Sequence, residues 1–396
     1  MVAKNSSDIP DYAIWLSPAK EERMAAIFEE TAINGMTMRN RLIRSATWEG
    51  MCDHDGRPTE NLITLYRDLA RGGIGLIITS YAYVRPDGKS LPGQMGIYTD
   101  GLADPFKRMA KAVHDTGGKI AVQIVHGGGQ TDTKTAGRKP FAPSAAKVEQ
   151  FPEMPEELTK DEINQIVAAF GKAACRAKAW GFDAVQLHGA HGFLINQFLS
   201  PLTNRRNDEY GGSMENRVRF LLEVYREVRK TVGADYPVLI KLNAADFIEG
   251  GLEIEDSIYA ARRLTEAGID AIEVSAGTPS SGGKSPVRTK ITKPEREAYN
   301  LEMARRIKRV LDCPVIVVGG FRSYEVVEKT IRDDGMDYIA LARPLIWEPG
   351  LAKRWLQGDR RPARCISCNN CFTGGLEEGG IYCATKKKEN EKAARP

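Results

Sequence analysis

The chain has 396 residues, 42% of them hydrophobic, and its 56 basic and 52 acidic side chains leave a net charge of +4. This length accommodates one large barrel or two medium domains, and so small a net charge does not indicate a nucleic-acid-binding protein. No apolar run approaches the ~18 residues of a membrane span, and the stretch from Met1 to Ile14 has no apolar core like that of a signal peptide. We therefore expect a cytoplasmic protein with neither a nucleic-acid nor a membrane partner.

Eight short apolar runs alternate with longer segments of helical patterning. The runs are Leu42–Ala46, Gly75–Thr79, Ile120–Val125, Phe182–Leu187, Val238–Leu242, Ala271–Val274, Pro314–Val318 and Tyr338–Ala342. Apolar runs that alternate with helices are typical of a parallel sheet that helices cover on its outer face. Eight such units predict an α/β fold, a (β/α)8 TIM barrel, with a doubly wound sheet as the alternative.

Two long polar segments, Tyr81–Asp100 and Gly127–Leu158, are predicted to be capping loops over the mouth of this barrel. Thr159, with Glu162 three residues later, predicts a capping box at the start of a helix. The predicted domains are an N-terminal arm over residues 1–25, the barrel over 26–358, and a cysteine-rich C-terminal extension over 359–396.

Two of the five histidines, His188 and His191, follow the fourth predicted strand in a turn that Gly189 and Gly192 flank. The carboxyl end of a barrel strand is where side chains meet a ligand. Two imidazoles there can donate hydrogen bonds to one oxygen atom of a bound molecule. The alternative is one core histidine and one loop histidine, but the pair favours a ligand site.

Lys241 lies inside the apolar run of the fifth predicted strand. A lysine in a buried strand is costly unless an anion or an acceptor receives its charge. Either a structural partner such as Asp246 or a ligand with electron-rich atoms would serve. Gln123, just before Ile124 and Val125 at the end of the third predicted strand, is a second polar candidate at the barrel's mouth.

The last two predicted strands end in residues typical of a phosphate site. Gly319 and Gly320 follow the seventh strand, and Ala342 and Arg343 end the eighth. In barrels, the loops after these two strands commonly hold a phosphate through backbone N–H groups. The glycine pair and the arginine together predict an anion site.

The C-terminal extension contains the array Cys365, Cys368, Cys371 and Cys383, spaced C-x2-C-x2-C-x11-C. An odd total of seven cysteines suits a reducing compartment better than a disulfide framework. The spacing favours four thiolate ligands of an iron–sulfur cube, [4Fe-4S]. A zinc site and unligated thiols remain as alternatives. No G-x-G-x-x-G follows a predicted strand, so no separate dinucleotide domain is expected.

These segments together resemble the Old Yellow Enzyme family of FMN-dependent oxidoreductases, over nearly the whole chain from Phe28 to Cys383. The segments that carry the resemblance are Asn40–Thr47, Gly75–Thr79, Gln123–His126, His188–Gly192 and Asn204–Arg217. The cysteine array resembles that of the iron–sulfur branch, which includes 2,4-dienoyl-CoA reductase and trimethylamine dehydrogenase.

The resemblance implies that FMN lies across the barrel's mouth. Lys241 would face the N1 and O2 atoms of the flavin, and His188 and His191 would bind a substrate carbonyl so that the β-carbon accepts hydride. The other implied cofactor residues are Ser45, Ala46, Thr47 and Tyr81 along the ring, Gln123 at its pyrimidine edge, and Gly319, Gly320, Ala342 and Arg343 around the phosphate.

The chain departs from the family at Phe193, where most members have a tyrosine that protonates the α-carbon of the substrate. Phenylalanine has no proton to give. Either water or another residue, such as Tyr81 or Tyr83, supplies it, or net alkene reduction is not the main reaction. A second departure is Trp48, directly after the segment at the flavin's edge.

The resemblance therefore implies a flavin-dependent enzyme that reduces C=C bonds conjugated to a carbonyl, in enones or enoyl thioesters, with electrons from NAD(P)H or a protein donor. The alternatives are a flavin-dependent dehydrogenase or isomerase, an FMN and iron–sulfur electron carrier without catalysis, and a flavin-free phosphate-binding barrel such as an aldolase. Thirteen residues follow Cys383, so we expect any cluster to exchange electrons with a separate protein. A homo-oligomer is also expected.

Overall fold

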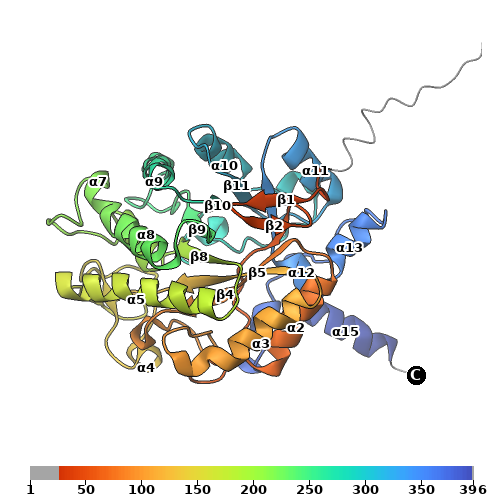
Figure 1. The fold of residues 1–396 in the computed structure, drawn as a ribbon, viewed down its shortest axis with the longest axis horizontal. Helices are drawn as coiled ribbons and strands as arrows, with labels where there is room; N and C mark the ends of the chain where they lie inside the picture. Colours follow the sequence, from red (N-terminus) through yellow and green to blue (C-terminus); the bar gives the residue numbers. More distant parts are fainter. Residues whose placement is uncertain (1–25, 395–396) are drawn as a thin grey trace, which may run out of the picture.

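Residues 26–394 are described by the computed structural model, which shows a closed barrel of eight parallel strands (Figure 1). The strands are β3 (Leu42–Arg44), β4 (Leu76–Tyr83), β5 (Lys119–Val125), β8 (Ala184–Gly189), β9 (Val238–Asn243), β10 (Ala271–Ser275), β11 (Val315–Val318) and β12 (Tyr338–Leu341). Each overlaps one predicted apolar run, and β12 pairs with β3 to close the barrel. The predicted (β/α)8 barrel is confirmed, and the doubly wound alternative is wrong.

Helices follow the strands and surround them in Figure 1. The main ones are α2 (Glu60–Arg71), α3 (Ala103–His114), α5 (Lys160–Ala179), α8 (Arg219–Val232), α9 (Ile254–Glu266), α10 (Leu301–Lys308), α11 (Tyr324–Arg332), α12 (Arg343–Trp347) and α13 (Leu351–Leu356). Thr159 and Glu162 form the predicted capping box at the start of α5. The shorter ones are α4 (Thr133–Ala136), α6 (Leu194–Leu199), α7 (Met214–Arg217), α14 (Cys371–Glu377) and α15 (Ala384–Ala393).

Alternate residues of each strand point into the barrel, and those nearest the amino-terminal end are apolar. A two-stranded antiparallel sheet of β1 (Thr31–Ile33) and β2 (Met36–Met38) packs against this inner layer. The buried cluster that results is Ile33, Met36, Met38, Ile43, Leu76, Ile78, Ala121, Ala184, Leu239, Ala271, Ile316, Tyr338 and Ala340. Packing therefore fills that end of the barrel, and the opposite end is left for a ligand.

The two long segments after β4 and β5 both reach this opposite end, as predicted. The first begins after Tyr83, since β4 is longer than its apolar run. The second carries α4 and a small parallel sheet of β6 (Phe141–Ala142) and β7 (Glu156–Glu157). The predicted arm over residues 1–25 lies outside the described residues, and the domain boundaries stay predictions.

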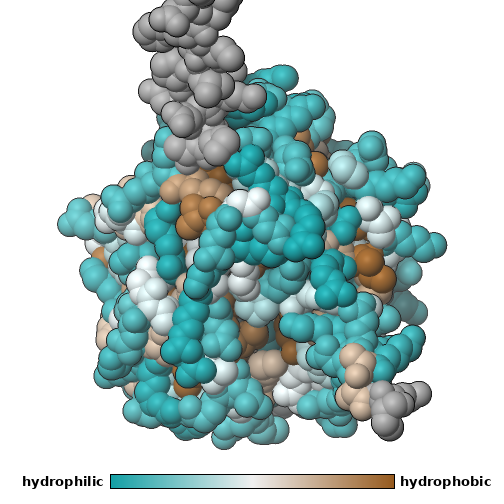
Figure 2. Space-filling model, turned by 90° about the vertical axis from the view of Figure 1, so that its right-hand side faces the viewer, coloured by the Kyte–Doolittle hydropathy of each residue, from teal (hydrophilic) through white to brown (hydrophobic). Residues whose placement is uncertain are grey.

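The face of the molecule drawn in Figure 2 is mostly hydrophilic, with hydrophobic residues scattered in small groups. In the described part of the chain, no helix has both the length and the apolar character needed to cross a membrane.

Candidate active site

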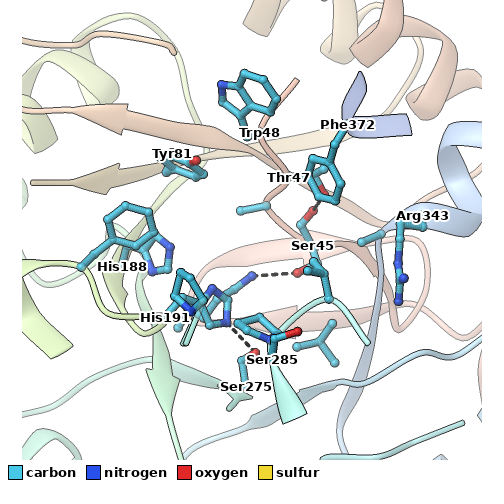
Figure 3. Close-up of a pocket in the computed structure, with 18 of the residues that line it drawn as sticks. Ser45, Thr47, Trp48, Tyr81, His188, His191, Ser275, Ser285, Arg343 and Phe372 are labelled. Carbon is cyan, nitrogen blue, oxygen red and sulfur yellow. Dashed lines mark hydrogen bonds between the residues drawn. The ribbon is translucent and has the colours of Figure 1, made fainter. Parts of the chain in front are cut away.

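A cavity of about 690 Å³ opens at the carboxyl ends of the strands (Figure 3). The predicted residues that line it are Ser45, Ala46, Thr47, Tyr81, Gln123, His188, His191, Lys241, Gly320, Ala342 and Arg343. Gly319 does not line it, but its backbone carbonyl accepts a hydrogen bond from the Tyr299 N–H at 3.1 Å, directly beside Gly320. The long loops add Ser90, Leu91, Gln130, Thr131, Asp132, Gln150 and Pro152 to the wall.

A buried polar chain of five side chains crosses the barrel at the floor of the cavity. Gln123 Nε2 donates to Gln186 Oε1 at 2.6 Å, and Gln186 Nε2 donates to Glu273 Oε2 at 2.8 Å. Ser45 Oγ donates to the other Glu273 oxygen at 2.6 Å and accepts a hydrogen bond from Lys241 Nζ at 2.8 Å. These contacts fix the orientation of each polar group that faces the cavity floor.

Lys241 forms an ion pair with Glu273, with Nζ and Oε1 3.2 Å apart. Burial lowers the pKa of Lys241, and the Glu273 carboxylate opposes that effect. The prediction that Asp246 is the structural partner of Lys241 is wrong. The Asp246 carboxylate instead accepts hydrogen bonds from the Asn243 side chain and from the Leu252 N–H. An ammonium group has three protons, so one more acceptor can be bound from the cavity.

The sequence reasoning missed Gln186 and Glu273. The sequence contains a signal for each residue. Gln186 stands two residues before His188 and therefore faces the same side of β8. Glu273 interrupts an apolar run in the middle of β10, as Lys241 does in β9.

The two predicted histidines lie side by side in the cavity, with ring centroids 5.3 Å apart. His188 lies within β8, not in the turn as predicted, and its neighbour across the sheet is Lys241. His191 has a positive φ of 62° in the following turn, and its Nε2 lies 2.8 Å from Ser275 Oγ. The left-handed backbone turns its ring back towards the cavity.

Both imidazoles are neutral at pH 7. Burial, and then the Lys241 charge, lowers the pKa of His191 to about 3. Burial, His191 and Lys241 together hold the pKa of His188 well below its usual range. Nδ1 of His188 is buried and has no hydrogen-bond partner among residues 26–394. Each neutral ring keeps one N–H, which it can donate to a bound oxygen atom.

An aromatic group closes the side of the cavity next to the histidines. The Phe193 ring lies 4.6 Å from the His188 ring and 5.1 Å from the Tyr81 ring. Trp48 lines the same cavity, and its Nε1 donates to the Pro92 carbonyl at 3.2 Å. Tyr83 lies outside, where its hydroxyl donates to the Asp55 carbonyl at 2.9 Å.

The far end of the cavity has the features of the predicted anion site. Arg343, at the start of α12, donates from Nη1 to the Arg288 carbonyl at 2.7 Å and to Asn369 Oδ1 at 2.6 Å. A guanidinium has five N–H donors, so others are left for an anion. Gly320 has a φ of 76°, and an added Cβ would come within 2.8 Å of the Tyr299 ring.

These residues fit FMN. A volume of this size lies in the range of about 300–1,000 Å³ usual for small-molecule sites. Gln123 Oε1 and His188 Nδ1 are buried without partners within the described chain. Both atoms can form hydrogen bonds with a bound heteroaromatic ring. Lys241 supplies positive charge at the floor of the cavity, and Arg343 supplies it at the far end.

The four thiols of the cysteine array are partly buried and unpaired. Burial raises the pKa of Cys371 to about 11, and the neighbouring Cys365 and Cys368 thiols contribute. Burial also raises the pKa of Cys365, with a further contribution from Cys383. The thiols of the array are thus near enough to one another to influence each other's pKa.

No three His, Cys, Asp or Glu side chains between residues 26 and 394 are placed to hold a single metal ion. Four zinc ligands would have to converge, because each Zn–S bond is ~2.3 Å long. A cubane binds each thiolate to a separate iron and needs wider spacing. The placement of these side chains therefore does not decide between the two alternatives, and the predicted ligands of an iron–sulfur cluster stay a prediction.

The array lies against the cavity wall. Ser367 and Phe372, from the same segment, line the cavity, and Asn369 connects the segment to Arg343. In Figure 3, Phe372 projects from the C-terminal segment towards Thr47 and Ser45.

Residues 26–361 match the model of the NADH:flavin oxidoreductase / NADH oxidase family. An NADH oxidase of Thermoanaerobacter brockii is 40% identical over 354 residues, 88% of this chain and 54% of that protein. An NADPH dehydrogenase of Clostridium acetobutylicum is 35% identical over 323 residues, 82% of this chain and 92% of that protein. The chain thus spans about half the length of the first relative and nearly all of the second.

Two solved structures have the same barrel. A 2-naphthoyl-CoA reductase in complex with 2-naphthoyl-CoA has a TM-score of 0.83 and 28% identity, over 91% of this chain and 57% of that one. An old yellow enzyme homologue from Zymomonas mobilis has a TM-score of 0.76 and 26% identity, over 91% of this chain and 98% of that one. The resemblance seen in the sequence is confirmed, and the family match supports FMN as the cofactor. The chain belongs to the NADH:flavin oxidoreductase / NADH oxidase family, the old yellow enzymes.

Proposed function

We propose that this protein uses NAD(P)H and FMN to reduce C=C bonds conjugated to a carbonyl group. The observation that carries the proposal is the pair of neutral imidazoles, His188 and His191, that project into one cavity above the buried Lys241. When bound, FMN supplies the hydride chemistry.

The histidines bind and polarise the substrate. Their N–H groups donate to the carbonyl oxygen, where negative charge develops as the β-carbon accepts hydride. Neutral rings suit this role, because they donate hydrogen bonds without the desolvation penalty of a buried cation. Ser275 holds His191 in place by its contact at Nε2.

The remaining predicted residues would hold the cofactor. Lys241 would bind the electron-rich edge of the flavin and Gln123 its pyrimidine edge. Ser45, Ala46, Thr47 and Tyr81 would line the ring, and Gly319, Gly320, Ala342 and Arg343 would hold the phosphate. The polar chain on the floor keeps Lys241 and Gln123 oriented before the cofactor arrives.

The substrate class is an enone or an enoyl thioester. The aromatic group of Tyr81, Phe193 and Trp48 offers apolar walls beside the histidines. The 2-naphthoyl-CoA complex supports a thioester, because that protein has the same barrel and binds a CoA ester.

A second function, dehydrogenation or isomerisation, is favoured by one observation. Phe193 packs on His188 and has no hydroxyl with which to protonate the α-carbon.

We further propose that Cys365, Cys368, Cys371 and Cys383 hold a [4Fe-4S] cluster beside the cavity, which exchanges electrons with another protein.

The test begins with the purified protein under anaerobic conditions. The cofactor released on denaturation is identified, and oxidation of NADH and NADPH is followed with and without 2-cyclohexenone or crotonyl-CoA. We expect FMN and acceptor-dependent oxidation of one nicotinamide. Release of no flavin, or dehydrogenation of the saturated compounds without reduction of either acceptor, contradicts the proposal.

A further inference from the structure

Reduction of a C=C bond adds a proton as well as a hydride, and the cavity must supply that proton. His188 and His191 are neutral and keep only an N–H, which is a very weak acid. Lys241 is engaged by Ser45 and Glu273. Asp132 is the carboxyl side chain among the described residues that line the cavity. It is engaged as the N-cap of α4, where it accepts a hydrogen bond from the Thr135 N–H.

The phenols that line the cavity within the described chain are Tyr81 and Tyr299. The Tyr299 hydroxyl donates to the Pro286 carbonyl at 3.0 Å and is already engaged. The Tyr81 hydroxyl makes no hydrogen bond to any residue from 26 to 394, and its ring lies 5.7 Å from the His188 ring. In Figure 3 its oxygen faces the middle of the cavity, between Trp48 and Thr47.

An irregularity in β4 brings Tyr81 to this position. The register between β4 and β5 shifts between Ile78 and Tyr81, after which Tyr81 pairs with Gln123. Ile78 faces the barrel interior, so a regular strand would turn Ser80 inward and Tyr81 outward. A bulge adds one residue and reverses that order, and bulges beside active sites commonly re-aim a side chain.

We propose that Tyr81 is the acid that protonates the α-carbon of the substrate, an inference that rests on the proposed function. Hydride adds to the β-carbon, and the π electrons move to the carbonyl oxygen held by His188 and His191. The electron pair of the resulting enolate takes the Tyr81 O–H proton at the α-carbon. The phenolate left behind recovers a proton from water.

The surroundings of Tyr81 keep its proton in place until it is needed. Burial, with a contribution from the Glu49 carboxylate, raises the pKa of Tyr81 above its ordinary value. The hydroxyl is therefore fully protonated at neutral pH, and only the strongly basic enolate carbon removes its proton.

The test is Tyr81→Phe, which keeps the ring against His188 and Phe193 and removes only the hydroxyl. The reduced holoenzyme is mixed anaerobically with 2-cyclohexenone, and return of the oxidised flavin spectrum is timed. We expect reoxidation to slow by about 10²- to 10⁴-fold, the usual contribution of a positioned acid. FMN content, reduction by NAD(P)H and binding of cyclohexanone should stay at the parent's values. Tyr83→Phe, the same change outside the cavity, should match the parent throughout.

Two further measurements separate a proton donor from a packing residue. The slow rate of Tyr81→Phe should rise with the concentration of imidazolium buffer, because a small acid can then enter the cavity. Adding Phe193→Tyr should also restore part of the rate, since that ring touches both Tyr81 and His188.

Parent-like reoxidation in Tyr81→Phe overturns the inference, as does a slow rate that neither buffer acid nor Phe193→Tyr restores. If the parent itself reduces neither 2-cyclohexenone nor crotonyl-CoA, the proposed function falls and this inference with it. If the parent and Tyr81→Phe reduce these acceptors at the same rate, Tyr81 is not the acid, but the proposed function stands.

Discussion

At the scale of single residues, the site depends on a buried ion pair whose partners lie on neighbouring strands. Lys241 and Glu273 are opposite each other in the register of β9 and β10, and both side chains are almost fully buried. Removing one partner of such a pair leaves an uncompensated charge in the interior, which typically costs 3–5 kcal/mol, so roughly that loss is expected here.

We predict that Glu273→Gln lowers the free energy of unfolding by about 3–5 kcal/mol, measured by denaturant titration of the flavin-free protein. Glu227→Gln is the control, because it breaks the exposed Lys230–Glu227 pair and should change stability by less than about 1 kcal/mol. Equal effects of the two substitutions would contradict the importance given to the buried pair.

His191 should make stability depend on pH. Its pKa in the folded protein is about 3, against about 6.5 in the unfolded chain, so the unfolded state binds more protons between these values. Stability is therefore fully present above about pH 6.5 and falls as the pH is lowered towards 3.

We predict that His191→Gln makes this decline shallower, as measured by chemical denaturation at several values from about pH 7 to about pH 5. The side chain of His54 is fully exposed, and His54→Gln should leave the slope of the parent. If the unfolding free energy of His191→Gln fell with pH as steeply as that of the parent, the His191 imidazole would not be held neutral in the folded protein.

At the scale of elements, the eight strands could be predicted because parallel strands are buried on both faces and read as apolar runs. The capping box and the histidine pair were also visible as local patterns. The bulge in β4 was not, because it is a property of the pairing with β5 and leaves no local signature. Asp246 is near Lys241 in the sequence but does not pair with it, whereas Glu273 lies opposite Lys241 on the adjacent strand.

The C-terminal extension makes the clearest prediction at this scale. Protein purified anaerobically should contain about four iron and four sulfide per chain, the content of a cubane. Cys368→Ser should lose most of both, whereas Cys175→Ser, at an exposed position outside the array, should keep them. One equivalent of zinc without iron would decide for the alternative site.

At the scale of the whole molecule, the extension and the barrel meet at the end of the cavity where Arg343 lies, the proposed phosphate site. Asn369, between two cysteines of the array, accepts a hydrogen bond from Arg343 and donates one to the Val287 carbonyl. From this junction the chain continues into α15, which projects from the barrel at the right of Figure 1. The cofactor site and the array are thus mechanically connected.

We predict that Arg343→Ala weakens FMN binding, since a charge-assisted hydrogen bond to phosphate contributes about 1.5–3 kcal/mol, or roughly 10- to 100-fold in affinity. Flavin retained after extensive dialysis measures the effect. Arg332→Ala, in an exposed part of α11, should retain the parent's flavin. Equal retention by both variants would remove Arg343 from the phosphate site.

The central claim is that this chain passes hydride from reduced FMN to an alkene conjugated to a carbonyl. A single anaerobic turnover tests it most directly. The protein is reduced with one equivalent of NADPH or NADH and mixed with 2-cyclohexenone, and the flavin spectrum and the cyclohexanone formed are measured together. We predict that the flavin is fully reoxidised with one cyclohexanone per FMN. A flavin that stays reduced, or that is reoxidised without cyclohexanone, would contradict the claim.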